Sequence, residues 1–512
     1  MGRKGLIRST GVIGAATALS RVLGFVRDIV IARFFGTAVF AQAFVVAFRI
    51  PNLLRDLIGE GAMNAALVPV LTEELATKGR KDFFRLAQVV LNILFVTLVV
   101  LTVIGVLAAP LIIRLIAPGF IENAEKFNVT VALTRMLFPF LILVGLWAYM
   151  MGMLNSLGYF AAPAFGPCVL NFFVIVCAAY FGENVFGLAS GVLIGGTAQL
   201  LIQFPPMWMN GWRPHITKEF RHPQAKKIGV LLIPRALGAC VYQINVFVST
   251  ILASLSAIVG EGAVAALYYA NRVWQLPLAI FGIALAQAAL PTMSRHAALK
   301  DMAKLKETVV FGLRVLFFIL IPSSVGLVVL SAPITKVLFE RGAFTSYSTL
   351  ITSNALVFYS AGLVACGGIK VLVNAFYAMN DTMTPVKTAV VSAVLNIVLN
   401  VALMWPLKIG GLALATSVSA TVNFVALYVL LEKRLGSLGT KEIAAYIVKV
   451  ASASAVMALV IKMILAKSSG SAGSVAGLLS CIGAGIISFT ACSYILGVGE
   501  LRELILWISK RR

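Results

Sequence analysis

The stretch ALSRVLGFVRDIVIARFFGTAVFAQAFVVAFRIPNLLRDLIGEG, residues 18–61, decides the fold class of this chain. It has the apolar mass of two membrane-spanning helices, yet it carries several ionisable side chains: Arg21, Arg27, Asp28, Arg33, Arg49, Arg55, Asp56 and Glu60. A guanidinium at the centre of a bilayer helix costs roughly 2.5 to 3.5 kcal/mol on insertion scales. We therefore expect most of these groups to face a water-filled cavity rather than lipid.

Helix geometry supports a cavity for the first of the two spans. An α-helix turns by about 100° per residue. This places Arg21, Arg27 and Asp28 within about one third of the helix circumference. Asp28 can neutralise only one arginine, so the surplus is positive and favours an anionic ligand. The alternative is that an arginine near a span end reaches lipid phosphates, and we expect this of Arg33 and Arg55.

The composition of the chain is that of a membrane protein. Its 512 residues are 60% apolar and only 12% charged, and the mean hydropathy is +0.98, far outside the range of soluble globular proteins. Segments of about 20 apolar residues predict about fourteen transmembrane helices, centred near residues 22, 46, 100, 140, 170, 198, 240, 276, 320, 360, 394, 420, 453 and 484. The fold class is therefore an all-α polytopic membrane protein.

The basic residues predict the orientation of the chain. Its formal net charge is +23, and lysines and arginines concentrate at the termini and in alternate segments between spans. The intervening loops hold few of them: Lys126, Lys336, Arg341, Lys408 and Lys467. By the positive-inside rule, both termini are cytoplasmic and the number of spans is even.

Two pairs of similar segments within the sequence indicate an internal duplication. With a shift of 223 residues Ala43 aligns with Ala266 and Arg49 with Arg272, and a similar shift brings Asn155 opposite Asn374. A shift of six helices gives two parallel six-helix lobes, with a substrate cavity between them where Arg49 and Arg272 face each other. We predict an N-terminal lobe over 1–222, a C-terminal lobe over 223–436, and two further helices over 437–512. Spans three to six carry few polar groups, and we expect them to be mostly scaffold.

The sequence lacks the residue patterns that several classes of function require. It has only nineteen acidic residues, and neither a phosphate-cradling glycine loop nor a dinucleotide fingerprint. Catalysis is therefore disfavoured, and no catalytic residue is predicted. His215 and His222 lie in a basic loop that favours solvated side chains over metal ligands, so no metal site is predicted. Asn396 and Asn400 favour hydrogen bonds between helices over an ion site.

The segments SRVLGFVRD, FRIPNLLRDLIGEGA, LVP and YYANRVWQLP resemble the MurJ (MviN) family of lipid II flippases, within the multidrug/oligosaccharidyl-lipid/polysaccharide exporter superfamily. The resemblance covers the whole chain. It implies fourteen helices, in which the last pair forms a groove that leads a polyprenyl tail towards a cationic cavity. It also implies that lipid II, an undecaprenyl-pyrophosphate-linked disaccharide-pentapeptide, moves from the inner to the outer leaflet of the bacterial cytoplasmic membrane for peptidoglycan synthesis.

The resemblance implies substrate-binding residues on the first, second and eighth helices: Ser20, Arg21, Arg27, Asp28, Arg49, Asn52, Arg55 and Arg272. Secondary candidates are Gln42, Glu60, Arg235 and Asn271. The chain departs from the family pattern where Gln42 and Asn271 stand in place of acids and Asp56 in place of a basic residue. Fewer acids leave Arg49 and Arg272 less neutralised. Arg235, in a Pro-Arg pair at the start of span seven, has no assigned role.

The expected mechanism is alternating access, in which arginines hold the pyrophosphate while the lobes rock. No cofactor is expected; sodium or the membrane potential resets the cycle, and we favour the potential because spans seven, eleven and twelve lack an interior carboxylate. Expected partners are lipid II, membrane lipids and peptidoglycan synthases, and not nucleic acid. The alternatives are a flippase for another polyprenyl-pyrophosphate-linked glycan, a drug exporter of the same superfamily and a non-transporting scaffold.

Overall fold

The computed structural model describes residues 3–55, 63–213, 219–220, 222–467 and 473–499. Within these ranges the regular secondary structure consists of helices, which are joined by turns and short irregular segments. The chain divides into two compact units, of which the first holds residues 1–255 and 341–344 and the second holds 256–340 and 345–512. The predicted boundary at 222 would place span seven in the second lobe, and that assignment stays a prediction.

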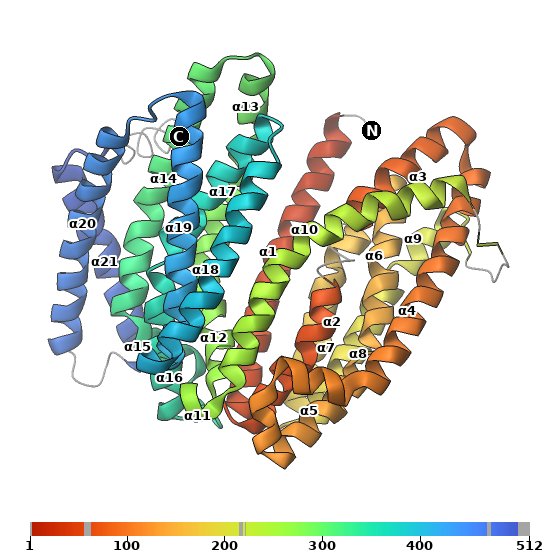
Figure 1. Cartoon of the computed structure of the whole chain (residues 1–512), viewed down its shortest axis with the longest axis horizontal. Coiled ribbons are helices and arrows are strands. Elements are labelled where there is room, and N and C mark those ends of the chain that lie inside the picture. The colour runs from red at the N-terminus through yellow and green to blue at the C-terminus, as the bar shows by residue number, and fades with distance from the viewer. Residues whose placement is uncertain (1–2, 56–62, 214–218, 221, 468–472, 500–512) are drawn as a thin grey trace. The chain divides into compact units, whose positions relative to one another are not determined.

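In the described part of the first unit there are ten α-helices and one short 3-10 helix, whose arrangement is drawn in Figure 1. Their bounds are α1 Arg3–Phe35, α2 Val39–Arg55, α3 Asn64–Lys78, α4 Arg80–Ile116, η2 Pro118–Glu122, α5 Ala124–Leu137, α6 Phe140–Ser156, α7 Ala161–Phe181, α8 Val185–Leu201, α9 Phe204–Met209 and α10 Pro223–Ser254. The second unit continues with α11 Ser256–Val259, α12 Ala263–Pro277, the π-helix η3 Leu278–Ile283, α13 Ala284–Ala298, α14 Met302–Val329, α15 Ser331–Phe339, α16 Ser346–Ser360, α17 Leu363–Ala378, α18 Met383–Leu407, α19 Ile409–Leu435, α20 Thr440–Lys467 and α21 Val475–Ile495.

The helices confirm the predicted all-α membrane fold. Among the described residues, ten helices are long and apolar enough to cross a membrane, or eleven when α16 and α17, bent by 44°, count as one span. The remaining predicted span centres lie in α1, α2 and α10. Arginines interrupt the apolar face of α1, and the apolar parts of α2 and α10 are short, at Val39–Leu53 and Gln243–Ser254. All fourteen predicted centres therefore fall inside helices.

Within the first unit, α1 packs along α7, and α7 packs in turn against α8. The helix α2 lies against α5 and α6, and α10 contacts α3 and α4. Exposed ion pairs at the start of α10 join Lys227 to Glu73 at 2.8 Å and Arg85 to Glu219 at 3.0 Å. The hydrogen bond from Arg85 lowers the pKa of Glu219 below its ordinary value. This packing places the charged stretch of α1 against the apolar helix α7.

Within the second unit, α14, α17 and α19 pack together, and α12 packs on α16. Figure 1 shows α20 and α21 side by side, and α20 also contacts α14. The Tyr446 hydroxyl of α20 donates to the Arg314 carbonyl of α14 at 3.2 Å, and the rings of Phe318 and Phe489 lie 5.3 Å apart. The last two helices thus form a pair on the surface of α14, and their role as a groove for a lipid tail stays a prediction.

Candidate functional site

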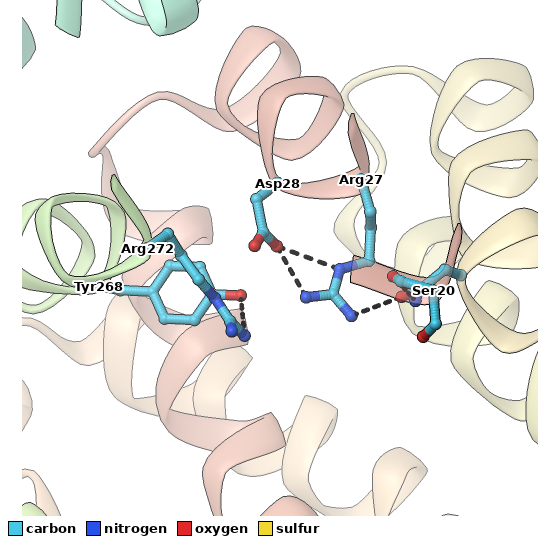
Figure 2. Close-up of polar contacts among 6 residues, drawn as sticks. Ser20, Arg27, Asp28, Tyr268 and Arg272 are labelled. Carbon is cyan, nitrogen blue, oxygen red and sulfur yellow. Dashed lines mark hydrogen bonds and ion pairs between the residues drawn. The ribbon is translucent and has the colours of Figure 1, made fainter. Parts of the chain in front are cut away.

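The guanidinium of Arg27 is held from two sides by side chains of α1 and α7 (Figure 2). Its Nε and Nη2 atoms donate to Oδ1 of Asp28, at 3.1 and 2.8 Å. Its Nη1 atom donates to Oδ1 of Asn171 at 2.9 Å. The Arg27 side chain is 13% exposed and that of Asp28 only 1%. The pair is therefore largely shielded from bulk solvent. In such a buried setting, charge-assisted hydrogen bonds are strong.

Asn171 is a member of this site that the sequence reasoning missed. Besides accepting from Arg27, its Nδ2 atom donates to the backbone carbonyl of Ser20 at 3.2 Å. The amide thereby fixes α7 against α1 at two points one to two turns apart. The prediction that spans three to six are mostly scaffold is compatible with this fastening role, but the residue itself was not singled out. The available signal was an isolated amide in an apolar helix, which in a membrane needs a hydrogen-bonding partner.

The other predicted residues of α1 lie differently. Arg21 is exposed on the surface of the first unit, and Ser20 is half-buried. In α2, Arg49 donates to the hydroxyl of Thr250 in α10, and Thr250 is buried. The structure therefore brings Arg27 and Asp28 together as predicted but engages Arg49 through a different helix.

Gln42 and Asn52 have contrasting surroundings in α2. The Gln42 side chain is buried and donates to the Thr37 carbonyl at 3.2 Å, so it ties the start of α2 to the turn that follows α1. Asn52 is half-buried beside Pro51. The side chains of Arg55 and Arg235, and all of Glu60, lie outside the described residues.

In the second unit, Arg272 of α12 stacks on an aromatic ring (Figure 2). Its guanidinium carbon lies 4.9 Å from the ring centroid of Tyr268, and its Nη2 atom donates to the Tyr268 hydroxyl at 3.1 Å. Asn271 accepts from Gln275 at 3.2 Å. The tyrosine, one helical turn away, orients the guanidinium of Arg272.

Several polar groups of α18 and α19 form hydrogen bonds with one another. Asn396 and Asn400 are fully buried; Asn400 donates to Asn396 at 2.7 Å, and Asn396 donates to the Ser419 hydroxyl at 3.1 Å. His222 accepts from the backbone of Gln224 at 3.2 Å and so caps α10, while His215 lies outside the described residues. In the part of the chain that the structure describes, no three His, Cys, Asp or Glu side chains gather as metal ligands.

Comparison with known proteins identifies the family. The family model described as lipid II flippase MurJ matches residues 31–480. The chain belongs to the MurJ family. A probable lipid II flippase MurJ of Vibrio cholerae is 36% identical over 520 residues, which cover 98% of both chains. The lipid II flippase MurJ of Burkholderia cenocepacia is 33% identical over 437 residues, 84% of each chain. Membership in MurJ confirms the resemblance and the prediction of a transporter rather than an enzyme.

Solved structures agree with the MurJ assignment. A lipid II flippase MurJ in an inward closed conformation superimposes with a TM-score of 0.81 at 27% identity, covering 96% of this chain and 99% of that one. A multidrug resistance MATE family transporter in an inward-facing conformation has a TM-score of 0.67 at 15% identity, covering 82% and 96%. The second likeness shows a shared fold only. The chain is thus a polytopic membrane protein of the MurJ family.

Removing the Asn171 amide should destabilise the first unit. In Asn171→Leu, Arg27 loses an acceptor in a buried setting, and a hydrogen bond to a charged group contributes about 1.5 to 3 kcal/mol. We expect a melting temperature lower by several degrees in detergent. Cys168→Ala is the matched control, because Cys168 lies one turn earlier on α7 and contacts the Ala16 carbonyl of α1 rather than Arg27. Equal melting temperatures for both variants would contradict a structural role for the amide.

Proposed function

We propose that this protein moves lipid II from the inner to the outer leaflet of the bacterial cytoplasmic membrane by alternating access. Membership in the MurJ family supports the cargo, and the likeness to a MurJ structure in an inward closed conformation supports the cycle. No chemical bond changes in this process. The protein's task is to hold a charged headgroup away from the hydrocarbon while it crosses.

The observation that carries the proposal is the setting of the arginines. Arg27 is oriented by Asp28 and Asn171, and Arg272 by Tyr268. Stacking uses the face of a guanidinium, whereas a phosphate binds its N–H edge in pairs of hydrogen bonds. An arginine stacked in this way is therefore preorganised to bind a phosphate through its N–H edge. We assign Arg272 and Arg49 to gripping the pyrophosphate, and Arg27 with Asp28 to shaping the site.

The remaining predicted residues keep supporting roles in this proposal. Ser20, Arg21, Asn52 and Arg55 complete the polar lining, and the pair α20 and α21 guides the polyprenyl chain. Another polyprenyl-pyrophosphate-linked glycan would satisfy the same cationic residues, and competition between substrates separates it from lipid II. A cationic drug would be repelled by Arg49 and Arg272, which argues against drug export.

We further propose that both termini are cytoplasmic, because the basic residues concentrate in the segments that would then face inward. Peptidoglycan synthases, which consume lipid II at the outer face, are the proposed protein partners. This orientation can be tested with a water-soluble amine reagent that does not cross the membrane. Added from outside, it should label lysines in the short loops, such as Lys408.

We propose the membrane potential as the force that resets the cycle. One elementary charge that crosses 100 mV changes its free energy by about 2.3 kcal/mol, and arginines on moving helices supply such charges. The buried amides Asn396 and Asn400 donate hydrogen bonds to neighbouring oxygens, whereas sodium favours oxygen ligands that include carboxylates. The α18–α19 network therefore supports helix packing rather than ion coupling.

Replacing Arg272 tests the proposed grip. In cells depleted of their own flippase, wild-type protein should restore outer-face accessibility of lipid II. Arg272→Ala should lower the transport rate by about tenfold or more, since charge-assisted hydrogen bonds contribute about 1.5 to 3 kcal/mol. Arg272→Lys should be intermediate, because it keeps the charge but loses the planar fork.

Arg135→Ala is the matched control, because Arg135 is an exposed arginine near the end of α5. Arg21→Ala extends the test to the first helix. Full transport by both Arg21→Ala and Arg272→Ala, at wild-type expression, would refute the proposed role of the arginines.

The driving force can be tested in the same cells. Collapsing the membrane potential at constant pH should slow lipid II transport severalfold, because the arginines then lose the field that returns them. Replacing external sodium by choline should leave the rate unchanged. The reverse pattern, with sodium required and the potential dispensable, would contradict the proposal.

A further inference from the structure

Arg314 is a cation inside a membrane-spanning helix of the second unit. It is half-buried in α14, two turns beyond Glu307, and this spacing corresponds to about 10 Å along the helix axis. Its guanidinium carbon lies 5.8 Å from the ring centroid of Tyr446 in α20, and the Tyr446 hydroxyl donates to the Arg314 carbonyl at 3.2 Å. One turn further along α14, Phe318 meets the ring of Phe489 in α21. Arg314 thus faces the seam between α14 and the last two helices.

The guanidinium of Arg314 has no carboxylate partner among the described residues. Its Nε atom is buried and donates to no acceptor there, whereas its two Nη atoms reach the surface of the unit. Glu442 lies one turn before Tyr446 on α20, but a Cβ added to Gly439 would lie 3.0 Å from its Oε2 atom, so this carboxylate turns back to the start of α20. Arginine stays protonated in proteins. The described part of the second unit therefore leaves the charge of Arg314 without a direct counter-charge.

The cost of this cation favours an anionic ligand. A charge within a membrane span is expensive unless a partner or water compensates it, and the ring of Tyr446 offers only a face to Arg314. Contact with that face leaves the two Nη atoms, which match phosphate oxygens as a pair. A second cation, Lys449, is exposed three residues after Tyr446, and this spacing puts both residues on one side of α20. Two cations beside an accessible guanidinium end suit the phosphate of a lipid.

We propose that Arg314, Tyr446 and Lys449 form a binding site for the phosphate of an anionic membrane phospholipid. Three spans separate α14 from α20, so the two helices run in the same direction. Tyr446 lies six residues after Thr440, the first residue of α20, which is about 9 Å along the helix. A long side chain on α14 leans towards the start of its helix, and therefore towards the headgroups of the leaflet in which both helices begin. The site goes beyond the proposed function and does not depend on it.

Binding of a defined phospholipid tests this site. The probe is phosphatidylglycerol, added to the delipidated full-length protein in detergent micelles, and bound lipid is counted by native mass spectrometry. We expect Arg314→Leu to weaken the tightest binding of phosphatidylglycerol by about tenfold, because charge-assisted hydrogen bonds to the phosphate are lost. Arg314→Lys should lose less, since it keeps the charge without the planar fork. Lys449→Gln should weaken binding severalfold.

Arg114→Leu is the matched control. The guanidinium carbon of Arg114 also lies beside a ring, 5.9 Å from the centroid of Phe127, but Arg114 is exposed in the last turn of α4. Its replacement should leave the tightest lipid binding unchanged. Phosphatidylcholine, which carries no net charge, should bind the wild type about tenfold more weakly than phosphatidylglycerol. Equal affinities of Arg314→Leu and the wild type, or of the two lipids, would overturn the site. Displacement of the lipid by an equal concentration of inorganic phosphate would overturn a phospholipid as its ligand.

Melting temperatures separate a ligand site from a purely structural contact. In lipid-free detergent, Arg314→Leu should melt at or above the wild-type temperature, because it removes a cation that no described carboxylate neutralises. Added phosphatidylglycerol should raise the melting temperature of the wild type and that of Arg314→Leu much less. A lower melting temperature of Arg314→Leu without lipid, together with an unchanged response to lipid, would overturn the site and leave Arg314 a structural role. None of these measurements uses lipid II, so they stand apart from the test of transport.

Discussion

The central constraint on this protein is the cost of a guanidinium inside a membrane-spanning helix. Arg27 meets that cost through Asp28 on its own helix and Asn171 on α7, and the second contact joins residues 144 positions apart. The packing of α1 on α7 is thus more than apolar contact. If the amide were absent, Arg27 would lose a buried acceptor, and α1 would lose two of its hydrogen bonds to α7.

The arginines have two different kinds of partner. Arg27 lies against the buried carboxylate of Asp28, so a pyrophosphate that approached it would compete with Asp28 and be repelled by it. Arg272 stacks on the Tyr268 ring and donates to its hydroxyl. The proposed function therefore gives Arg27 a positioning role and assigns the grip on the pyrophosphate to Arg272.

The fold was largely predictable because hydropathy is a local property. Every predicted span centre falls in a helix, and Arg27 and Asp28 of the first span form an ion pair. Contacts between distant helices were not predictable, since periodicity along one helix carries no information about its neighbours. The contacts of Asn171 with α1 and of Arg49 with Thr250 are of this kind. Gln42 was selected as a departure from a family motif, whereas its burial on the Thr37 carbonyl gives it a local structural role.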